Sequence, residues 1–205
     1  MVDGFVHLFL GFDDLLAVVA MAMLAGLGGR ALARRVTLAL PAAWLAGGVA
    51  GWLGFASRLP GSATAVSLLV LGLVVAADRR APPAFPLGLA AIAGLLHGAL
   101  NGASLAGAGR EALLALAGTA GAAMVVSLVV SRIASSTRRP WQRVAVRVAG
   151  SWIAAVGLLY LGWALKGGTV PAFGGLSPSC MQHGDSSQEA GTVPGNSPLR
   201  ACGRG

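Results

Sequence analysis

Long apolar stretches separated by short polar connections run through most of the chain. A helix that crosses the hydrocarbon core of a membrane needs about 20 mainly apolar residues, and local thinning of the bilayer can accommodate a shorter one. These lengths fit helices better than barrel strands. The pattern therefore predicts an all-α fold over residues 1–166, a polytopic membrane helix bundle with six transmembrane helices. The six stretches are 5–29, 36–55, 63–77, 85–107, 112–130 and 144–165.

Residues 167–205 differ from the rest of the chain, because Gly, Ser, Pro and small polar residues replace the apolar stretches. Such a segment buries too little apolar surface to offset the entropy of ordering it, so we expect a disordered C-terminal tail. The tail holds both cysteines, Cys180 and Cys202, which can form a disulfide in an oxidising compartment. Cys180 could instead join Met181 and His183 as soft metal ligands.

The composition supports the membrane interpretation. Of the 205 residues, 56% are hydrophobic and only 11% are charged, and the mean hydropathy of +0.75 is too high for a soluble domain of this length. The formal net charge is +8. The arginines lie in short connections, however, and form no basic face beside stacking aromatics, so no nucleic-acid partner is expected.

The uneven distribution of arginine among the connections predicts the orientation. Cytoplasmic connections of membrane proteins carry an excess of Lys and Arg. The second and fourth connections carry only Arg58 and Arg110, whereas the odd connections carry Arg30, Arg34, Arg35, Arg79, Arg80, Arg132, Arg138, Arg139 and Arg143. We therefore expect the odd connections in the cytoplasm and both termini outside. The first residues lack the basic region of a secretory leader, so we expect the first helix to be retained.

Two adjacent carboxylates, Asp13 and Asp14, lie inside the first apolar stretch. A charged side chain near the middle of a bilayer costs about 3 kcal/mol or more, so such residues usually face a protein interior and serve an ion or proton path. The pair therefore marks a candidate site. The structural alternatives are an ion pair with Arg147 and the capping of a broken first helix.

Polar residues with helical spacing extend this site. In a continuous first helix His7 shares a face with Asp14, and in the fourth stretch His97 shares a face with Asn101 and Ser104. In the expected orientation Asp14 and His97 lie at similar depths, roughly 14 and 12 Å from the outer surface. We therefore expect a His/Asp site between these helices, at the end of a shaft from the outer face. Alternatively, a lone histidine only hydrogen-bonds a neighbour.

A stripe of small residues marks another face of the fourth stretch. Gly94, Gly98 and Gly102 recur at every fourth position, a pattern that lets membrane helices approach closely. We expect this face to receive a neighbouring helix, which can belong to a protein partner or to a second copy of the chain. The five tryptophans, Trp44 among them, are interpreted as packing and interfacial anchors.

The two polar runs resemble motifs of the HupE/UreJ family of small bacterial membrane proteins. The run His7-Leu-Phe-Leu-Gly-Phe-Asp13-Asp14 is similar to the first-helix motif, His-x-x-x-Gly-x-Asp-His, and residues 96–102 are similar to the His-Gly-rich second motif. Size, helix layout and motif order agree over residues 1–166. The resemblance implies a multi-pass protein of the bacterial inner membrane that transports nickel or cobalt for hydrogenase or urease maturation.

The chain departs from these motifs at ligand positions. Asp14 stands where the family pattern has a histidine, and Ala99 and Asn101 stand where it has further histidines. The expected metal ligands are therefore His7, Asp13, Asp14, His97 and the amide oxygen of Asn101. Imidazole suits nickel, zinc and copper, whereas carboxylate and amide oxygens suit manganese or magnesium. Nickel or cobalt is expected as cargo, zinc and manganese stay open, and no permanently bound cofactor is expected.

Together these observations predict a permease that leads a divalent transition-metal cation from the outer face to a His/Asp site between helices. The chain has no ATP-binding loop of the form G-x-x-x-x-G-K-[ST], so any energy must come from an ion gradient or a partner. An enzyme is not expected, because no nucleophile and base are placed together. The alternative function is a non-transporting structural subunit of a larger membrane complex.

Overall fold

The computed structural model describes residues 8, 11–56, 60, 62–79, 81–107, 109–136 and 140–166. All of them belong to one compact unit, residues 1–173. The predictions made for His7, for the tail at 167–205 and for its two cysteines lie outside the described residues.

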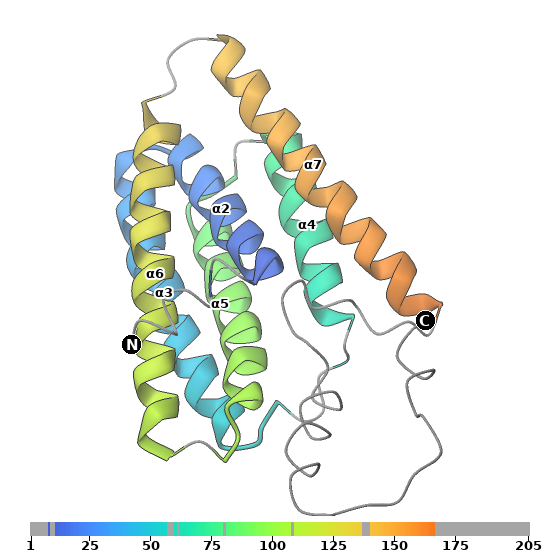
Figure 1. Cartoon of the computed structure of the whole chain (residues 1–205). Helices are drawn as coiled ribbons and strands as arrows, with labels where there is room; N and C mark the ends of the chain where they lie inside the picture. Colours follow the sequence, from blue (N-terminus) through green and yellow to red (C-terminus); the bar gives the residue numbers. More distant parts are fainter. Residues whose placement is uncertain are drawn as a thin grey trace, which may run out of the picture. The chain divides into compact units, whose positions relative to one another are not determined.

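Every regular element in the described part of the chain is an α-helix, which confirms the all-α prediction (Figure 1). Helices α5, α6 and α7 are long and apolar enough to cross a membrane, and α4 is apolar but shorter. Six crossings and outer termini stay predictions. The helices of this part are α2 (Phe12–Leu27), α3 (Arg30–Trp52), α4 (Ala63–Ala77), α5 (Ala84–Ser104), α6 (Gly109–Ser135) and α7 (Pro140–Leu165).

The prediction of a continuous first helix is wrong. Gly11 is not helical, with φ −78° and ψ 85°, and α2 begins at Phe12. Glycine has the greatest backbone freedom and a low helix propensity, so it is a weak point in this stretch. Asp13 and Asp14 occupy the first turn of α2, where the partial positive charge of a helix N-terminus stabilises carboxylates. The face that His7 was expected to share with Asp14 assumed an unbroken helix, and His7 itself lies outside the described residues.

The arginines of the first predicted connection are part of a helix. Arg30, Arg34 and Arg35 form the first turns of α3, and only Gly28 and Gly29 separate α3 from α2. Gly29 has φ 95°, a left-handed conformation that glycine adopts without a steric penalty, so it makes the sharp reversal between the helices. Arginine is a good helix former, so the helix continues beyond the apolar pattern.

The glycine stripe of α5 packs against α3 of the same chain. A Cβ at Gly98 would collide with the carbonyl group of Trp44, and one at Gly102 would collide with that of Gly48. A Cβ at Gly94 would lie 2.7 Å from the carbonyl oxygen of Leu40. This corrects the expectation that the stripe of Gly94, Gly98 and Gly102 is open to a protein partner or a second copy, because α3 already fills it.

A second close pair is formed by α4 and α7, where Gly72 and Gly150 let the two backbones touch. Helix α2 lies at the centre of the bundle, since it contacts each of the other five described helices. It is correspondingly well buried, and Val18 and Met21 are wholly inaccessible to solvent. The start of α2 is only partly enclosed, because Asp14 is buried whereas Phe12 is exposed.

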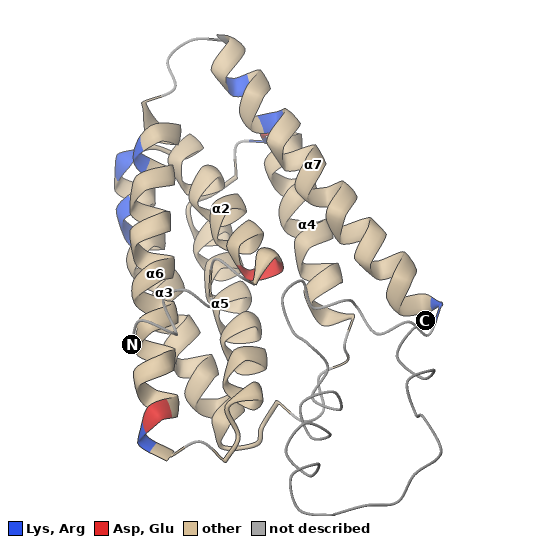
Figure 2. Ribbon diagram, viewed as in Figure 1, with Lys and Arg blue, Asp and Glu red and all other residues tan. Residues whose placement is uncertain are grey.

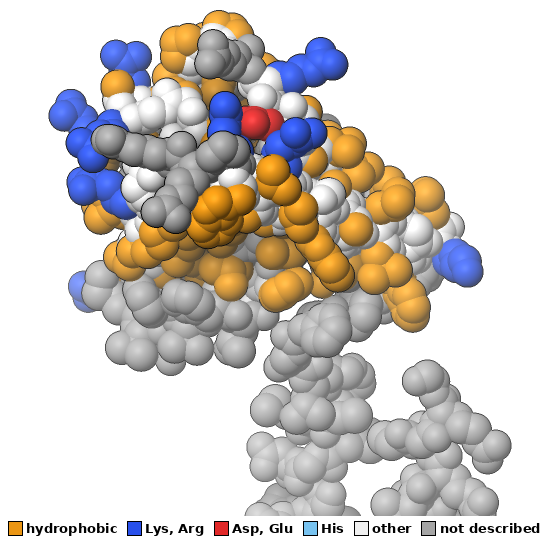
Figure 3. Space-filling model, turned by 90° about the horizontal axis from the view of Figure 1, so that it is seen from above, with side chains coloured by type: hydrophobic (Ala, Val, Ile, Leu, Met, Phe, Trp, Pro, Cys, Tyr) orange, Lys and Arg blue, Asp and Glu red, His pale blue; other side chains and the backbone are white. Residues whose placement is uncertain are grey.

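The outer surface is strongly apolar. Large side chains on α6 and α7 are exposed, among them Ile133 at 64%, Leu159 at 69% and Trp152 at 71%. A soluble monomer rarely exposes contiguous apolar surface of this extent, whereas a membrane protein presents it to lipid. Figure 3 shows such side chains along the sides of the molecule. The described unit is that of a membrane protein.

Positive charge collects at one end of the bundle. Figure 2 shows Lys and Arg where α3 and α7 begin and where α6 ends, and Figure 3 views the molecule from this end. The described arginines of the first and fifth predicted connections thus lie at a common end, as a cytoplasmic location requires. Arg143 there forms an ion pair of 3.2 Å with Asp78 at the end of α4.

Candidate metal centre

A completely buried histidine joins three helices. His97 on α5 has an exposed fraction of 0%. Its Nδ1 lies 2.7 Å from Oδ1 of Asp14 on α2, and its Nε2 lies 2.8 Å from Oγ of Ser67 on α4. An ionised carboxylate can only accept, so Nδ1–H donates to Asp14, and in a neutral ring Nε2 accepts the Ser67 hydroxyl proton. These bonds bring together Asp14 and His97, whose matched depths the sequence predicted.

Asn101 holds the other carboxylate oxygen. Its Nδ2 donates to Oδ2 of Asp14 at 2.6 Å and to the carbonyl oxygen of His97 at 2.9 Å. Both partners only accept, so the amide must turn its nitrogen toward them. The amide nitrogen, and not the oxygen expected as a ligand, therefore faces Asp14, and Asn101 acts on the site by orienting this carboxylate.

Asp13 completes a cluster of metal-ligating groups. One ligand atom from each of Asp13, Asp14 and His97 lies within 4.8 Å of the others. Asp14 is buried and Asp13 is half-buried. Two carboxylates beside one imidazole give a site whose ionised groups favour a cation in a low-dielectric interior.

No arginine compensates this charge among the described residues, where the ion pairs join Asp14 to His97 and Asp78 to Arg143. Arg147, which the sequence offered as a partner, donates from Nε to the carbonyl oxygen of Ala76 at 3.2 Å. The second structural role considered for the two carboxylates was the capping of a broken first helix. The first stretch is indeed interrupted, because α2 starts beside the carboxylates. The N-cap residue, Gly11, has no side chain that could cap the helix, and both carboxylates lie in the first turn of α2. Figure 2 shows this acidic start of α2 about halfway along the bundle.

Two further residues of the site were missed by sequence reasoning. Ser67 was detectable as a polar residue within the third apolar stretch. Trp44 was interpreted as an anchor, but it is 1% exposed and stacks on His97, with ring centroids 5.7 Å apart and an interplanar angle of 25°. Its position in the middle of the second stretch, far from either end, was the available signal.

Ser104, which the sequence places on the same face as His97 and Asn101, lies outside the cluster. Ser104 is exposed, and its hydroxyl donates to the carbonyl oxygen of Asn101 at 2.7 Å. His7, expected at the outer mouth, belongs to the part of the chain that is not described. The assembled centre therefore consists of Asp13, Asp14 and His97, with Asn101, Ser67 and Trp44 around them.

Comparison with known proteins identifies the family to which the chain is related. Residues 1–160 match the model of the family described as HupE / UreJ protein. "Protein HupE" of Rhizobium leguminosarum bv. viciae is 31% identical over 159 residues, which cover 77% of this chain and 82% of the relative. No solved structure matches. The matched region contains every residue of the centre.

Proposed function

Because the chain belongs to the HupE/UreJ family, we propose that it is a membrane permease for a divalent transition-metal cation. Nickel or cobalt is the cargo that the family favours, whereas zinc would suit the imidazole and manganese the two carboxylates. The observation that carries the proposal is the buried cluster of Asp13, Asp14 and His97 inside the bundle. The proposed location is the bacterial inner membrane, which the protein crosses several times.

The ion takes the place of the proton shared by His97 and Asp14. Adjacent ligand atoms around a metal with bonds of about 2.1 Å lie about 3 Å apart. The 2.7 Å between Nδ1 and Oδ1 therefore needs to open only slightly, while Asp13 moves closer. Nδ1 must lose its proton first, since a metal binds the unprotonated nitrogen.

Ser67 suits both states of the histidine. Its hydroxyl can donate to Nε2 when Nδ1 carries the proton, and it can accept from Nε2–H when Nδ1 binds the ion. The hydrogen bond at 2.8 Å thus persists while the ring changes tautomer. Asn101 keeps Oδ2 of Asp14 in place throughout, so that Oδ1 stays directed at the histidine.

Proton exchange gives the site a means of release. A proton that returns to Nδ1 competes with the ion, and a transport site must bind weakly enough to let its cargo go. Access from the outer face past His7 is part of the proposal. No nucleotide-binding loop occurs in the chain, so a gradient or a partner supplies the driving force.

One observation favours a second candidate function. Asp14, His97, Ser67 and Asn101 satisfy one another by hydrogen bonds without an ion. A closed network of this kind can serve to hold α2, α4 and α5 together in a structural subunit of a larger membrane complex. Under this alternative the network persists, but no metal crosses the membrane.

Metal flux separates the two functions. Proteoliposomes loaded with a metal-sensitive dye receive nickel, cobalt, zinc or manganese, and saturable uptake by the wild type is the expected result. Asp14→Asn and His97→Gln abolish it, whereas Ser104→Ala, a change at an exposed polar residue on the same helix as His97, retains it. Absence of saturable uptake for all four ions by folded wild-type protein would favour the structural subunit.

A further inference from the structure

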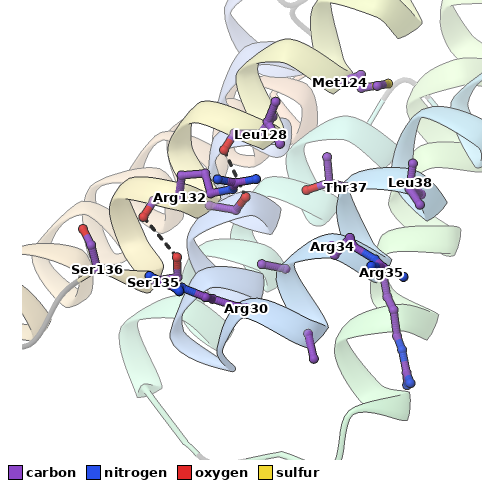
Figure 4. Close-up of a pocket in the computed structure, with 13 residues that line it drawn as sticks. Arg30, Arg34, Arg35, Thr37, Leu38, Met124, Leu128, Arg132, Ser135 and Ser136 are labelled. Carbon is purple, nitrogen blue, oxygen red and sulfur yellow. Dashed lines mark hydrogen bonds between the residues drawn. The ribbon is translucent and has the colours of Figure 1, made fainter.

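A cavity lies at the arginine-rich end, away from the metal centre. It has a volume of about 910 Å³ and opens between the first half of α3 and the last part of α6. Figure 4 shows its two walls, with residues 30–38 of α3 on one side and residues 124–136 of α6 on the other. Nothing in the proposed transport mechanism uses this groove.

One end of the groove is strongly basic. It is lined by Arg30, Arg34, Arg35 and Arg132, all of them exposed. None of the four takes part in an ion pair among the described residues, whose ion pairs lie elsewhere. Three of them also sit in the first turns of α3, where the helix N-terminus adds positive potential. The groove thus combines uncompensated charge with a helix end that favours anions.

The other end of the groove is apolar. Leu38, Met124 and Leu128 line it and are 59%, 45% and 44% exposed. Leu38 lies eight residues beyond Arg30 on α3, and Met124 lies eight residues before Arg132 on α6, about 12 Å along each helix. Both walls therefore change from charged to apolar in the same direction, because the two helices run antiparallel.

The serine hydroxyl groups of the groove leave anion binding to the arginines. Ser131, Ser135 and Ser136 each donate to a backbone carbonyl of their own helix, at 3.3, 3.0 and 2.8 Å. Their protons are thereby engaged. In Figure 4 the side chains of Arg30 and Arg132 come from facing helices near the same end of the groove. Guanidinium groups are well suited to phosphate, which they bind through paired N–H donors.

We propose that this groove binds an anionic phospholipid. The phosphate of the headgroup is held by Arg30, Arg34 and Arg132, and an acyl chain runs along Leu38, Met124 and Leu128. A free phosphate ion would satisfy the arginines but leave the apolar wall uncovered, whereas a lipid matches both ends. Basic pockets between membrane helices are typical of anionic headgroup sites on the cytoplasmic side, and the arginines of this end belong to connections expected there.

Lipid binding by the purified full-length protein tests the proposal. Delipidated protein in neutral detergent is titrated with phosphatidylglycerol, phosphatidylcholine or glycerol phosphate, and bound lipid is counted by native mass spectrometry. We expect retained phosphatidylglycerol and an affinity at least about tenfold above that for phosphatidylcholine, a difference that a specific phosphate–arginine site readily supplies. Equal retention of the two lipids overturns the proposal, and equal binding of glycerol phosphate and phosphatidylglycerol overturns the assignment to a lipid.

Matched variants locate the site. Arg34→Gln combined with Arg132→Gln, and Arg132→Gln alone, weaken phosphatidylglycerol binding, whereas Arg110→Gln, which removes an exposed charge at the start of α6, leaves it unchanged. Met124→Gln weakens the lipid but not glycerol phosphate. Circular dichroism and size-exclusion chromatography establish that each variant is folded. A loss with Arg110→Gln as large as that with Arg132→Gln contradicts the site, because it shows a response to net charge alone.

Discussion

Nδ1 of His97 lies 2.7 Å from Oδ1 of Asp14, although 83 positions separate the two residues in the sequence. The bond joins α5 to the first turn of α2, at the point where the helix begins after the break at Gly11. Its partners are the imidazole and the carboxylate of the proposed ion site. The same contact therefore contributes to the packing of the bundle and joins two of the proposed metal ligands.

The proposed exchange at this bond moves a ring proton without releasing it. When nickel or cobalt binds Nδ1 of His97, the ring carries its proton on Nε2 and donates it to Ser67, so the imidazole stays neutral. Binding of the ion to the wild type in weakly buffered detergent solution is therefore expected to leave the pH of the medium unchanged, as recorded by a pH-sensitive dye. Metal-dependent acidification by the wild type that is lost in His97→Gln would contradict the tautomer change.

Ser67→Ala removes the hydroxyl partner of Nε2. The buried ring nitrogen then lacks a hydrogen bond, which we expect to lower the free energy of unfolding by about 1 kcal/mol and to slow metal uptake, since one tautomer loses its support. Ser67→Thr retains the hydroxyl and is expected to restore uptake. Uptake by Ser67→Ala equal to that of the wild type would show that the tautomer change does not depend on this residue.

Substitutions of Trp44 test whether its ring keeps His97 in position. Nε1 of Trp44 is buried and has no hydrogen-bond partner among the described residues. Trp44→Phe keeps an aromatic ring against His97 and removes this unsatisfied donor, so stability and metal binding stay close to those of the wild type. Trp44→Ala leaves a cavity and lowers the free energy of unfolding by about 3–5 kcal/mol. Thermal unfolding with and without nickel measures both effects.

Alanine substitutions at two glycines of α5 test the close packing of this helix against α3. A Cβ at Gly98 collides with the carbonyl group of Trp44, whereas a Cβ at Gly88 meets no atom within 4 Å. Gly98→Ala is expected to destabilise the protein by about 1–3 kcal/mol and to reduce metal binding, because Trp44 must shift from His97. Gly88→Ala is expected to leave both unchanged or to raise stability slightly. Equal behaviour of the two variants contradicts the close approach of the helices.

The sequence predicted the parts of this architecture that depend on local pattern. Apolar length identified the helices, and the third stretch agrees with the bounds of α4. The pairing of Asp14 with His97 followed from depth, since helices of known direction carry residues to calculable heights. The break at Gly11 was missed because it occurs within an apolar stretch, where hydrophobicity does not distinguish a continuous helix from an interrupted one.

The contacts between helices at the site could not be predicted from the sequence. Which helix occupies the stripe of Gly94, Gly98 and Gly102 depends on the arrangement of the bundle, and the helix turned out to be α3. The amide orientation of Asn101 depends on the two acceptors that it meets, one of them on another helix. Ser67 acquires its role only when α4 lies beside His97. No local pattern encodes these contacts.

The metal content of the purified protein tests the central claim most directly. The protein, carrying Cys180→Ser, His183→Ala and Cys202→Ser to remove the thiols and the imidazole of the tail, is dialysed against nickel or cobalt, and bound metal is measured by elemental analysis. We expect about one ion per chain, which is lost in Asp14→Asn and His97→Gln and retained in Ser104→Ala. Equal metal content in Asp14→Asn, His97→Gln and the parent protein, or no metal in any of the folded proteins, would contradict a cation site at Asp13, Asp14 and His97.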